Sequence, residues 1–381
     1  MNLKKILTEP NFALHQVKPT LLRSLNKRLS PFLAGYSFSL KHVWIMLSYR
    51  CNLSCQICGL WGKAGVWKEL PPEDLKEELK SKEITSLVND LAPYQPLVLL
   101  TGGEPLLAKN WYEVALRLKK KDLRCSISTN GTKILENKDK IMEVIDNLDV
   151  SLDGNKEIHD KLRGVPGTYE LVIEGIKEID RLKKKRKQKK PYLKVSFTIN
   201  ELNYFYLKEM VALLQSLNID LDTLNFRHLA FASEKTISKH KEVFSKKFQL
   251  KISSLDGFIF KPKIDLNTLI EQIKEIKKVR LKNIKEVNFE PDLSLLEIKG
   301  FYSNPNFVPP KFSKKCFFPW LGVSILPNGD VWLCPDYIIG NLKEERFSHL
   351  WNNKRAKALR SYLNKFGLFP ACHTCASLYV D

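Results

Sequence analysis

The stretch YRCNLSCQICG, residues 49–59, places Cys51, Cys55 and Cys58 in a CxxxCxxC spacing directly after a hydrophobic run, HVWIMLS (42–48), that is typical of a β-strand. A 4Fe–4S cluster takes one ligand per iron, so three cysteines would leave one iron open to a ligand that is not protein. The alternative is a zinc knuckle, but structural zinc is four-coordinate and no fourth Cys or His follows within a few residues. The spacing therefore predicts a cluster with one open iron.

Further motifs follow in order, each at the end of an apolar run. They are LVLLTGGEPLL (97–107), SISTNGT (126–132), VSLDG (150–154) and HDKLRG (159–164). Together with the cysteine spacing they resemble the radical S-adenosylmethionine (SAM) enzymes, whose CxxxCxxC is followed by a GGE motif, here Gly102, Gly103 and Glu104. The resemblance covers residues 42–229.

The resemblance implies a mechanism and a set of SAM contacts. SAM would chelate the open iron and be cleaved reductively to methionine and a 5′-deoxyadenosyl radical, with electrons from a reductant such as flavodoxin or ferredoxin. The methionine amino group would meet the GGE motif, and Arg163 would offer its planar fork to the carboxylate; the alternative for Arg163 is an exposed arginine at a helix start. Arg227 would contact the substrate. The implied SAM contacts are Gly102, Gly103, Glu104, Ser151, Arg163 and Leu229.

Apolar runs alternate with helical patterns from residue 42 onward. This βα repeat predicts an α/β fold with a parallel sheet wrapped into a partial (βα)6 barrel of the TIM type. Strands are expected near 43–48, 97–101, 123–129, 147–152, 193–200 and 223–229, and helices near 72–91, 109–120, 133–145, 168–184 and 204–217. The expected divisions are an N-terminal basic amphipathic extension (1–41), the barrel (42–229), a bridging region with a charged helix near 265–282 (230–311), and a small C-terminal cysteine-rich domain (312–381).

Alternation along the strands predicts what the barrel contains. Polar and apolar side chains alternate with period two, so each class lies on one face of the sheet. A closed barrel fills its centre with aliphatic side chains, so polar inward positions predict an open cavity for a polar ligand. Cys125 belongs to the apolar face, and His228 is expected to face the helices. The polar positions are Ser126, Ser128, Ser151, Asp153, Ser196, Thr198 and Asn200.

A second cysteine set lies near the end of the chain. Asn-Gly in LPNGDVWLC (326–334) predicts a tight hairpin that brings Cys316 and Cys334 together. With the terminal CxxC, the pattern resembles the SPASM or shortened "twitch" domain of radical SAM enzymes and implies one auxiliary, fully ligated 4Fe–4S cluster. A four-cysteine zinc site is the alternative, and His373 is not expected to be a ligand. The expected ligands are Cys316, Cys334, Cys372 and Cys375.

Composition restricts the remaining classes of function. The formal charge of +20 invites nucleic-acid binding, but much of the excess lies in RLKKKRKQKK (181–190), without the interleaved aromatic residues that stack on bases. No run approaches the roughly 18 apolar residues of a membrane span, and no signal-peptide core is present. We expect a cytoplasmic protein whose cysteines bind metal.

The segment TLLRSLNKRLSPFL (20–33) predicts a basic amphipathic helix with Leu21, Leu22, Leu25 and Leu29 on one face. Such a helix can lie on an anionic membrane. We expect instead that its leucine face packs against the barrel, as in most surface helices of soluble proteins.

These features predict a radical SAM enzyme with one auxiliary cluster that accepts an electron from a substrate radical or orients it. The preferred substrate class is a small molecule, sugar or lipid. A peptide-modifying maturase is the alternative within the family, and a nucleic-acid-binding metalloprotein is the alternative outside it.

Overall fold

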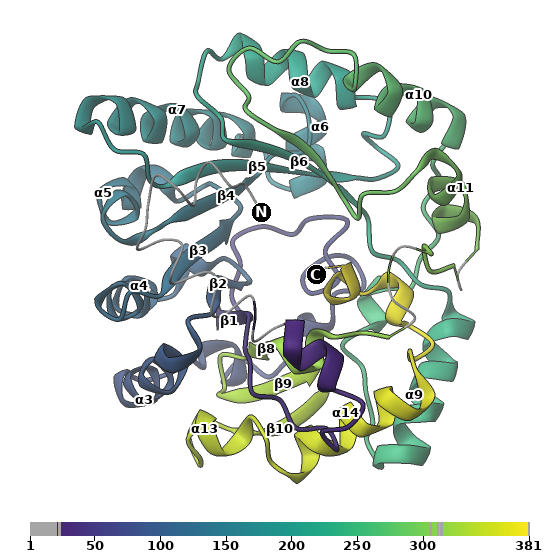
Figure 1. The fold of residues 1–381 in the computed structure, drawn as a ribbon. Coiled ribbons are helices and arrows are strands. Elements are labelled where there is room, and N and C mark those ends of the chain that lie inside the picture. Colours follow the sequence, from purple (N-terminus) through teal and green to yellow (C-terminus); the bar gives the residue numbers. More distant parts are fainter. Residues whose placement is uncertain (1–20, 22–23, 305–306, 311, 313–314, 380–381) are drawn as a thin grey trace.

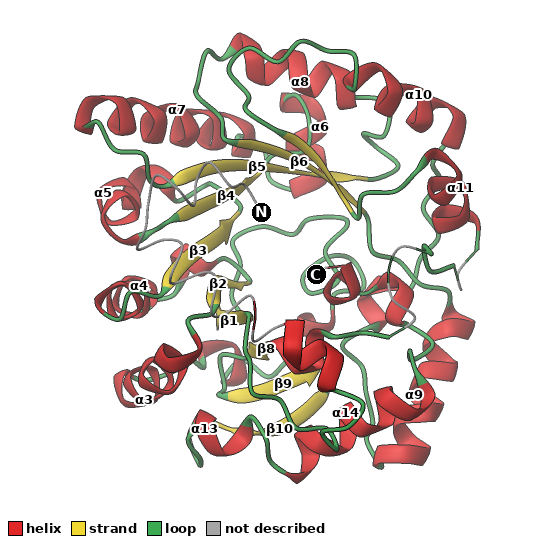
Figure 2. Ribbon diagram, in the orientation of Figure 1, coloured by secondary structure: helices red, strands yellow, loops and turns green. Residues whose placement is uncertain are grey.

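The structure is a computed structural model that describes residues 21, 24–304, 307–310, 312 and 315–379. One sheet has the strand order β10-β9-β8-β1-β2-β3-β4-β5-β6-β7. Figure 2 shows it as a curved sheet with helices on its outer side. The strands are β1 (His42–Ser48), β2 (Leu97–Gly102), β3 (Arg124–Thr129), β4 (Asn147–Ser151), β5 (Tyr192–Ile199), β6 (Thr223–His228), β7 (Val287–Glu290), β8 (Gly322–Ile325), β9 (Asp330–Cys334) and β10 (Tyr337–Asn341).

The helices follow the strands as a βα repeat requires (Figure 1). They are α3 (Ser81–Leu91), α4 (Trp111–Lys120), α5 (Ile134–Val144), α6 (Lys156–Arg163), α7 (Thr168–Arg186), α8 (Leu207–Ser216), α9 (Glu234–Phe248), α10 (Leu266–Ile276), α11 (Leu295–Ser303), α12 (Phe318–Leu321), α13 (Phe347–Leu350) and α14 (Lys354–Phe366). The partial barrel and its six expected strands are confirmed.

The region 230–311 is more regular than the sequence indicated. It contains α9, α10 and α11, and β7 adds a seventh parallel strand beside β6. β7 has only four residues, too few for a clear alternation. The helix expected over 265–282 ends at Ile276, and the one expected over 72–91 begins at Ser81, after two short 3₁₀ turns and Pro71-Pro72. Helix α6 was not expected.

The C-terminal cysteine region shares the sheet of the barrel. β8 pairs in parallel with β1, with His42 opposite Gly322 and Ile45 opposite Ile325. β9 and β10 then extend the sheet in antiparallel fashion. The barrel and the segment from 312 onward are therefore joined by backbone hydrogen bonds.

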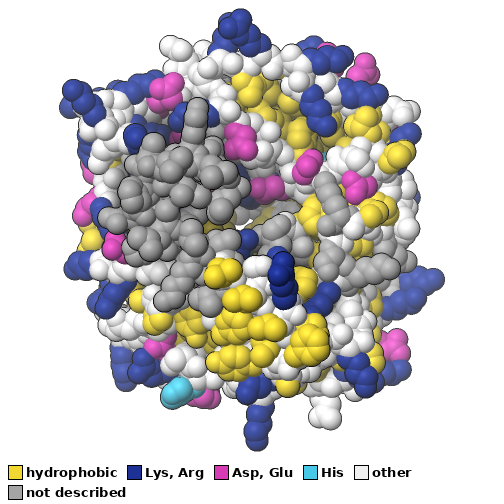
Figure 3. Space-filling view, in the orientation of Figure 1, with side chains coloured by type: hydrophobic (Ala, Val, Ile, Leu, Met, Phe, Trp, Pro, Cys, Tyr) yellow, Lys and Arg dark blue, Asp and Glu magenta, His cyan; other side chains and the backbone are white. Residues whose placement is uncertain are grey.

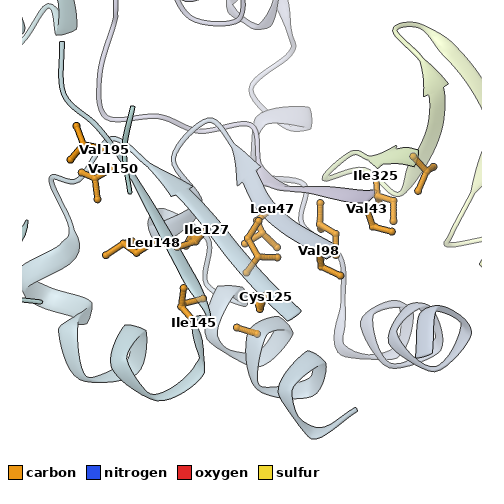
Figure 4. Close-up of a cluster of buried hydrophobic side chains, with 14 of the residues drawn as sticks. Val43, Leu47, Val98, Cys125, Ile127, Ile145, Leu148, Val150, Val195 and Ile325 are labelled. Atoms are coloured by element: carbon orange, nitrogen blue, oxygen red, sulfur yellow. The ribbon is translucent and has the colours of Figure 1, made fainter. Parts of the chain in front are cut away.

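The apolar face of the sheet forms the core against the helices. Figure 4 shows side chains from β1 to β5 and β8 meeting in one layer, including Val43, Val98 and Ile127, all fully buried. Cys125 belongs to this layer and is also fully buried. Its expected position away from the cavity is confirmed.

The opposite face carries a charged network. Arg227 pairs with Asp149 at 2.8 Å and with Glu290 at 3.2 Å. Lys194 lies 3.4 Å from Glu290, and the Ser196 hydroxyl donates to Asp149 at 2.6 Å. Neighbouring strands β4 to β7 supply these groups on the face away from the helices. The predicted polar lining is confirmed.

The expectation for the N-terminal helix is wrong. Leu21, Leu25 and Leu29 are exposed, whereas Asn26 and Ser30 are fully buried. Leu22 lies outside the described residues. The Asn26 amide donates to the Ser37 hydroxyl at 3.0 Å and to the Trp320 carbonyl at 3.3 Å. The polar side of this helix is therefore its packed side. Within the described part of the chain, no helix is both long and apolar enough to cross a membrane.

His228 lies at the end of β6 and faces the helices, as expected. It is buried, and its Nδ1 lies 2.9 Å from the Tyr302 hydroxyl. Burial lowers the pKa of His228 to about 3. The neutral imidazole is therefore the form that the folded protein accommodates.

This burial predicts a loss of stability in acid. Because the folded-state pKa is below the ordinary value of about 6.5, the unfolded chain binds the extra proton between these pH values. The contribution of the neutral His228 to the free energy of unfolding is complete above pH 6.5. It decreases as the pH falls, by up to about 2 kcal/mol at pH 5. Urea unfolding of His228→Leu should show a shallower decrease than wild type between pH 7 and pH 5.

The exposed His349 provides the control. His349→Gln should retain the wild-type pH dependence. Equal slopes for His228→Leu and wild type would contradict the assignment to His228.

Candidate functional site

The first cysteine loop leaves the end of β1 and is held by α6. The Gln56 amide donates to the Leu162 carbonyl at 2.9 Å. Gly164 caps α6 at φ +73°, where a Cβ would lie 2.8 Å from the Ser54 hydroxyl. The HDKLRG motif thus ends a helix against the loop that carries Cys55.

The two glycines of the GGE motif allow β2 to run against the start of this loop. The amides of Gly103 and Glu104 donate to the carbonyls of Ser48 and Arg50, each at 2.8 Å. A Cβ on Gly103 would lie only 2.1 Å from the Arg50 oxygen, and one on Gly102 only 2.6 Å from the Ser48 oxygen. Their absent side chains therefore position the backbone that precedes Cys51.

Glu104, expected to meet the amino group of SAM, comes two residues after the end of β2. Its side chain is fully buried. Its Oε1 accepts from the Thr129 hydroxyl at 2.7 Å and from the Leu106 amide at 3.0 Å, and its Oε2 accepts from the Asn130 amide at 2.8 Å. Burial raises the pKa of the Glu104 carboxyl, and these hydrogen bonds oppose the rise. The carboxylate bridges the ends of β2 and β3.

Asn130 extends this bridge to the cysteine loop. Its side-chain Nδ2 donates to the Asn52 side-chain oxygen at 2.9 Å and lies 3.9 Å from the Cys51 sulfur. Its Oδ1 accepts from the Thr132 hydroxyl and amide at 2.7 and 3.0 Å. The sequence indicated only a turn here. The polar pair Asn52 and Asn130, each beside a motif, was the available signal.

Each sulfur of the first set has a donor beside it. The Leu53 amide lies 3.4 Å from the Cys51 sulfur, the Trp61 amide 3.3 Å from that of Cys58, and Arg163 Nη1 3.8 Å from that of Cys55. Burial raises the pKa of the Cys51 thiol to about 12 and also raises that of Cys55. Such donors stabilise sulfur that carries negative charge, as it does when bound to iron.

Arg163 is neither exposed nor at a helix start, because it is the last residue of α6. Its side chain is 12% exposed and pairs with Asp153, which is 1% exposed. Asp153 is fixed in turn by the Thr198 amide at 2.8 Å. The guanidinium therefore lies between a buried carboxylate and the Cys55 sulfur.

The remaining expected SAM contacts lie at strand ends. Ser151 is the last residue of β4 and is half-buried, and Leu229 follows β6 and is buried. The carboxyl ends of parallel strands form one rim of a βα barrel. Both residues are on the same rim as the cysteine loop and the GGE motif.

The second cysteine set surrounds a cavity. The expected hairpin is present, with Gly329 at φ +93° in the turn between β8 and β9. Burial and the neighbouring Cys372, Cys375 and Cys316 raise the pKa of the Cys334 thiol. All four line a cavity of about 290 Å³ whose wall also includes Met46 and Trp44 of β1.

Two histidines lie near these cysteines. His240 on α9 lines the same cavity, is 2% exposed, and accepts the Ala371 amide on Nδ1 at 3.4 Å. His373 Nδ1 lies 3.0 Å from the Pro370 carbonyl. Sequence reasoning missed His240, which lies in a helix that was not expected.

The donor sets fit iron–sulfur clusters by their chemistry. Both are all sulfur, the ligand type that such clusters use. Among the described residues, no group of three or more His, Cys, Asp or Glu side chains is arranged to hold a metal ion. The fit of the second set therefore rests on the cavity that its four cysteines line.

Comparison with known proteins gives two family matches. Residues 45–186 match the sequence model of the radical SAM superfamily, and residues 316–376 match that of the SPASM iron–sulfur cluster-binding domain. The chain is 31% identical over 211 residues to Fe-coproporphyrin III synthase of Methanosarcina barkeri, covering 54% of this chain and 49% of that protein. It is 31% identical over 189 residues to pre-heme d1 synthase of Dinoroseobacter shibae, covering 49% and 43%. The chain thus spans about half the length of these curated relatives.

Among solved structures, SuiB of Streptococcus suis bound to precursor peptide SuiA superposes with a TM-score of 0.57 at 15% identity. The match covers 88% of this chain and 70% of SuiB. At this identity the likeness shows a shared fold.

Glu104→Gln tests whether the carboxylate is a bridge or a ligand contact. A glutamine amide has one acceptor oxygen for three donors, so the free energy of unfolding in urea should fall by about 1–3 kcal/mol. Glu136→Gln, whose side chain is 63% exposed, is the control and should change stability by less than about 0.5 kcal/mol. Wild-type stability with weakened SAM binding would contradict the bridge and restore the ligand contact.

Proposed function

The chain belongs to the radical SAM superfamily and carries a SPASM iron–sulfur domain, and we propose that Cys51, Cys55 and Cys58 hold a 4Fe–4S cluster at which SAM is cleaved reductively. The observation that carries the proposal is the position of these cysteines on the rim of a βα barrel, beside the GGE motif and on the sheet whose inner face carries the charged network of β4 to β7. When bound, cluster and SAM would supply an electron and a carbon radical able to remove hydrogen from a substrate.

The residues around the first site would bind and orient SAM. Backbone carbonyls at Gly102 and Gly103 suit an ammonium group, and the guanidinium of Arg163 suits a carboxylate. The pairing of Arg163 with Asp153 fixes the direction of its remaining donors. Ser151 would offer its hydroxyl to the ribose or methionine part, and Leu229 an apolar contact to adenine.

We propose that Cys316, Cys334, Cys372 and Cys375 ligate one auxiliary 4Fe–4S cluster. Four ligands leave no open iron, so this cluster would accept an electron from a substrate radical or orient the substrate. The cavity is walled by β1, whose far end leads into the first cysteine loop. A zinc ion bound by the same four thiols is the alternative.

The charged network supports a small polar substrate. Arg227 and Lys194 place two cations on the inner face, and both lie beside carboxylates that a substrate carboxylate could replace. Two relatives are named as synthases, one of Fe-coproporphyrin III and one of pre-heme d1. We propose a small carboxylate-bearing molecule, with a peptide as the alternative substrate.

Iron analysis tests both cluster assignments. Anaerobically reconstituted protein should carry about eight irons per chain, because each of the two clusters contributes about four. Replacing Cys51, Cys55 and Cys58 with alanine should remove about half, and so should replacing the four auxiliary cysteines. Cys125→Ala, at a buried cysteine outside both sets, should keep the full count.

A wild-type count of about four irons per chain would refute the auxiliary cluster, because two cubane clusters require about eight. Stoichiometric zinc that is lost with the four auxiliary cysteines would refute it as well.

Arg163→Ala tests the SAM contact. The variant loses a charge-assisted contact, so the Kd for SAM should rise by about tenfold or more while the iron count stays. Dithionite should release 5′-deoxyadenosine from wild type and less from the variant. Arg181→Ala, at an exposed arginine on α7, should match wild type. Unchanged SAM affinity in Arg163→Ala would remove this residue from the site.

A further inference from the structure

The N-terminal segment presents an apolar surface to solvent. Leu21, Leu25, Leu29 and Tyr36 are exposed, and Phe32 is 83% exposed. Figure 3 shows hydrophobic side chains gathered over this segment, with Lys and Arg side chains around them. Contiguous apolar patches on a protein surface typically mark interaction sites, whereas single exposed apolar residues do not.

Polar contacts hold this orientation. The Asn364 amide donates to the Ser30 carbonyl at 2.8 Å, and the buried Arg360 donates to the Gly35 carbonyl at 3.1 Å. The Asn352 side chain accepts the Ser37 amide at 2.8 Å. Turning the leucines inward would break these bonds and bury the leucines against polar groups. The outward apolar face is therefore part of the packed structure.

The surrounding charge has one sign. Residues 24–41 contain three Lys or Arg, residues 351–370 contain five, and neither stretch contains Asp or Glu. The two stretches lie together, since Lys357 lies over the Tyr36 ring at 5.8 Å. Arg28, Lys357 and Lys365 are exposed. We call these three cations and the five apolar residues of the N-terminal segment the basic apolar face.

We propose that the basic apolar face docks on an anionic lipid bilayer. An amphipathic surface with leucine and phenylalanine flanked by Lys and Arg inserts its apolar side chains at the headgroup boundary. The cations then gain from the negative surface potential of the leaflet. An acid-free surface matches that field better than it matches a second copy of this basic chain. The proposal is independent of the radical chemistry, because docking requires neither cluster nor SAM.

Vesicle flotation tests the proposal with the full chain. Wild type should float with vesicles of phosphatidylcholine mixed with phosphatidylglycerol, less with phosphatidylcholine alone, and less as salt increases. Leu25→Glu/Leu29→Glu/Phe32→Glu and Arg28→Glu/Lys357→Glu should each weaken binding by about tenfold or more. Leu296→Glu, at an 81% exposed leucine on α11, should float like wild type.

Other occupants of the face give different results. Failure of wild type to float, or flotation unchanged in both sets of variants, would overturn the proposal. A wild-type dimer in sedimentation velocity that the triple variant abolishes would assign the face to a second copy. A marked loss of thermal stability in Phe32→Glu alone would show that the chain itself covers the face. Iron content and SAM cleavage should stay at wild-type levels in Phe32→Glu.

Discussion

The buried carboxylate of Glu104 is the interaction on which the site depends. A charge without solvent is costly unless hydrogen bonds satisfy it, and this one takes donors from Thr129, Asn130 and Leu106. Those donors come from the end of β3 and from the turn after β2, while the backbone of Glu104 is bonded to Arg50. Three strand ends therefore hold one another in place, and the cysteine loop begins one residue after Arg50.

The shared sheet also holds the two cysteine sets in fixed positions relative to each other. β1 leads into the first set, and β8, paired with β1, leads through a hairpin into Cys334 at the end of β9. Core side chains of both parts, such as Val43 and Ile325, lie in one layer. A fixed separation between two redox groups suits electron transfer, so the shared sheet gives the proposed auxiliary cluster a defined position relative to the first.

The features of the fold and of the site that could be predicted from the sequence are those that depend on local patterns. Alternation along a strand assigns its faces wherever one face is buried, so the polar lining and the buried Cys125 followed from a few residues each. The motifs from the first cysteine loop to VSLDG likewise marked strand ends. Long-range partners decided the rest. The N-terminal helix packs by Asn26, whose side-chain amide donates to the Trp320 carbonyl, 294 residues away. The bridging role of Glu104 depends on Thr129 and Asn130, which periodicity could not place beside it.

The charged network gives the inner face of the sheet a way to accept a charged ligand without a large cost in free energy. Arg227 is held by Asp149, which is 11% exposed, and by Glu290, which is 51% exposed. Burial raises the pKa of Glu290, but Lys194 and Arg227 outweigh it and hold that pKa below its ordinary value, so the network carries two charges of each sign near neutral pH. A substrate carboxylate that displaced the exposed Glu290 would keep Arg227 paired, while Asp149 fixed the guanidinium from the other side. Exchange of one carboxylate for another returns Glu290 to water and leaves no buried charge unpaired, which is the condition for binding an anion in such a place.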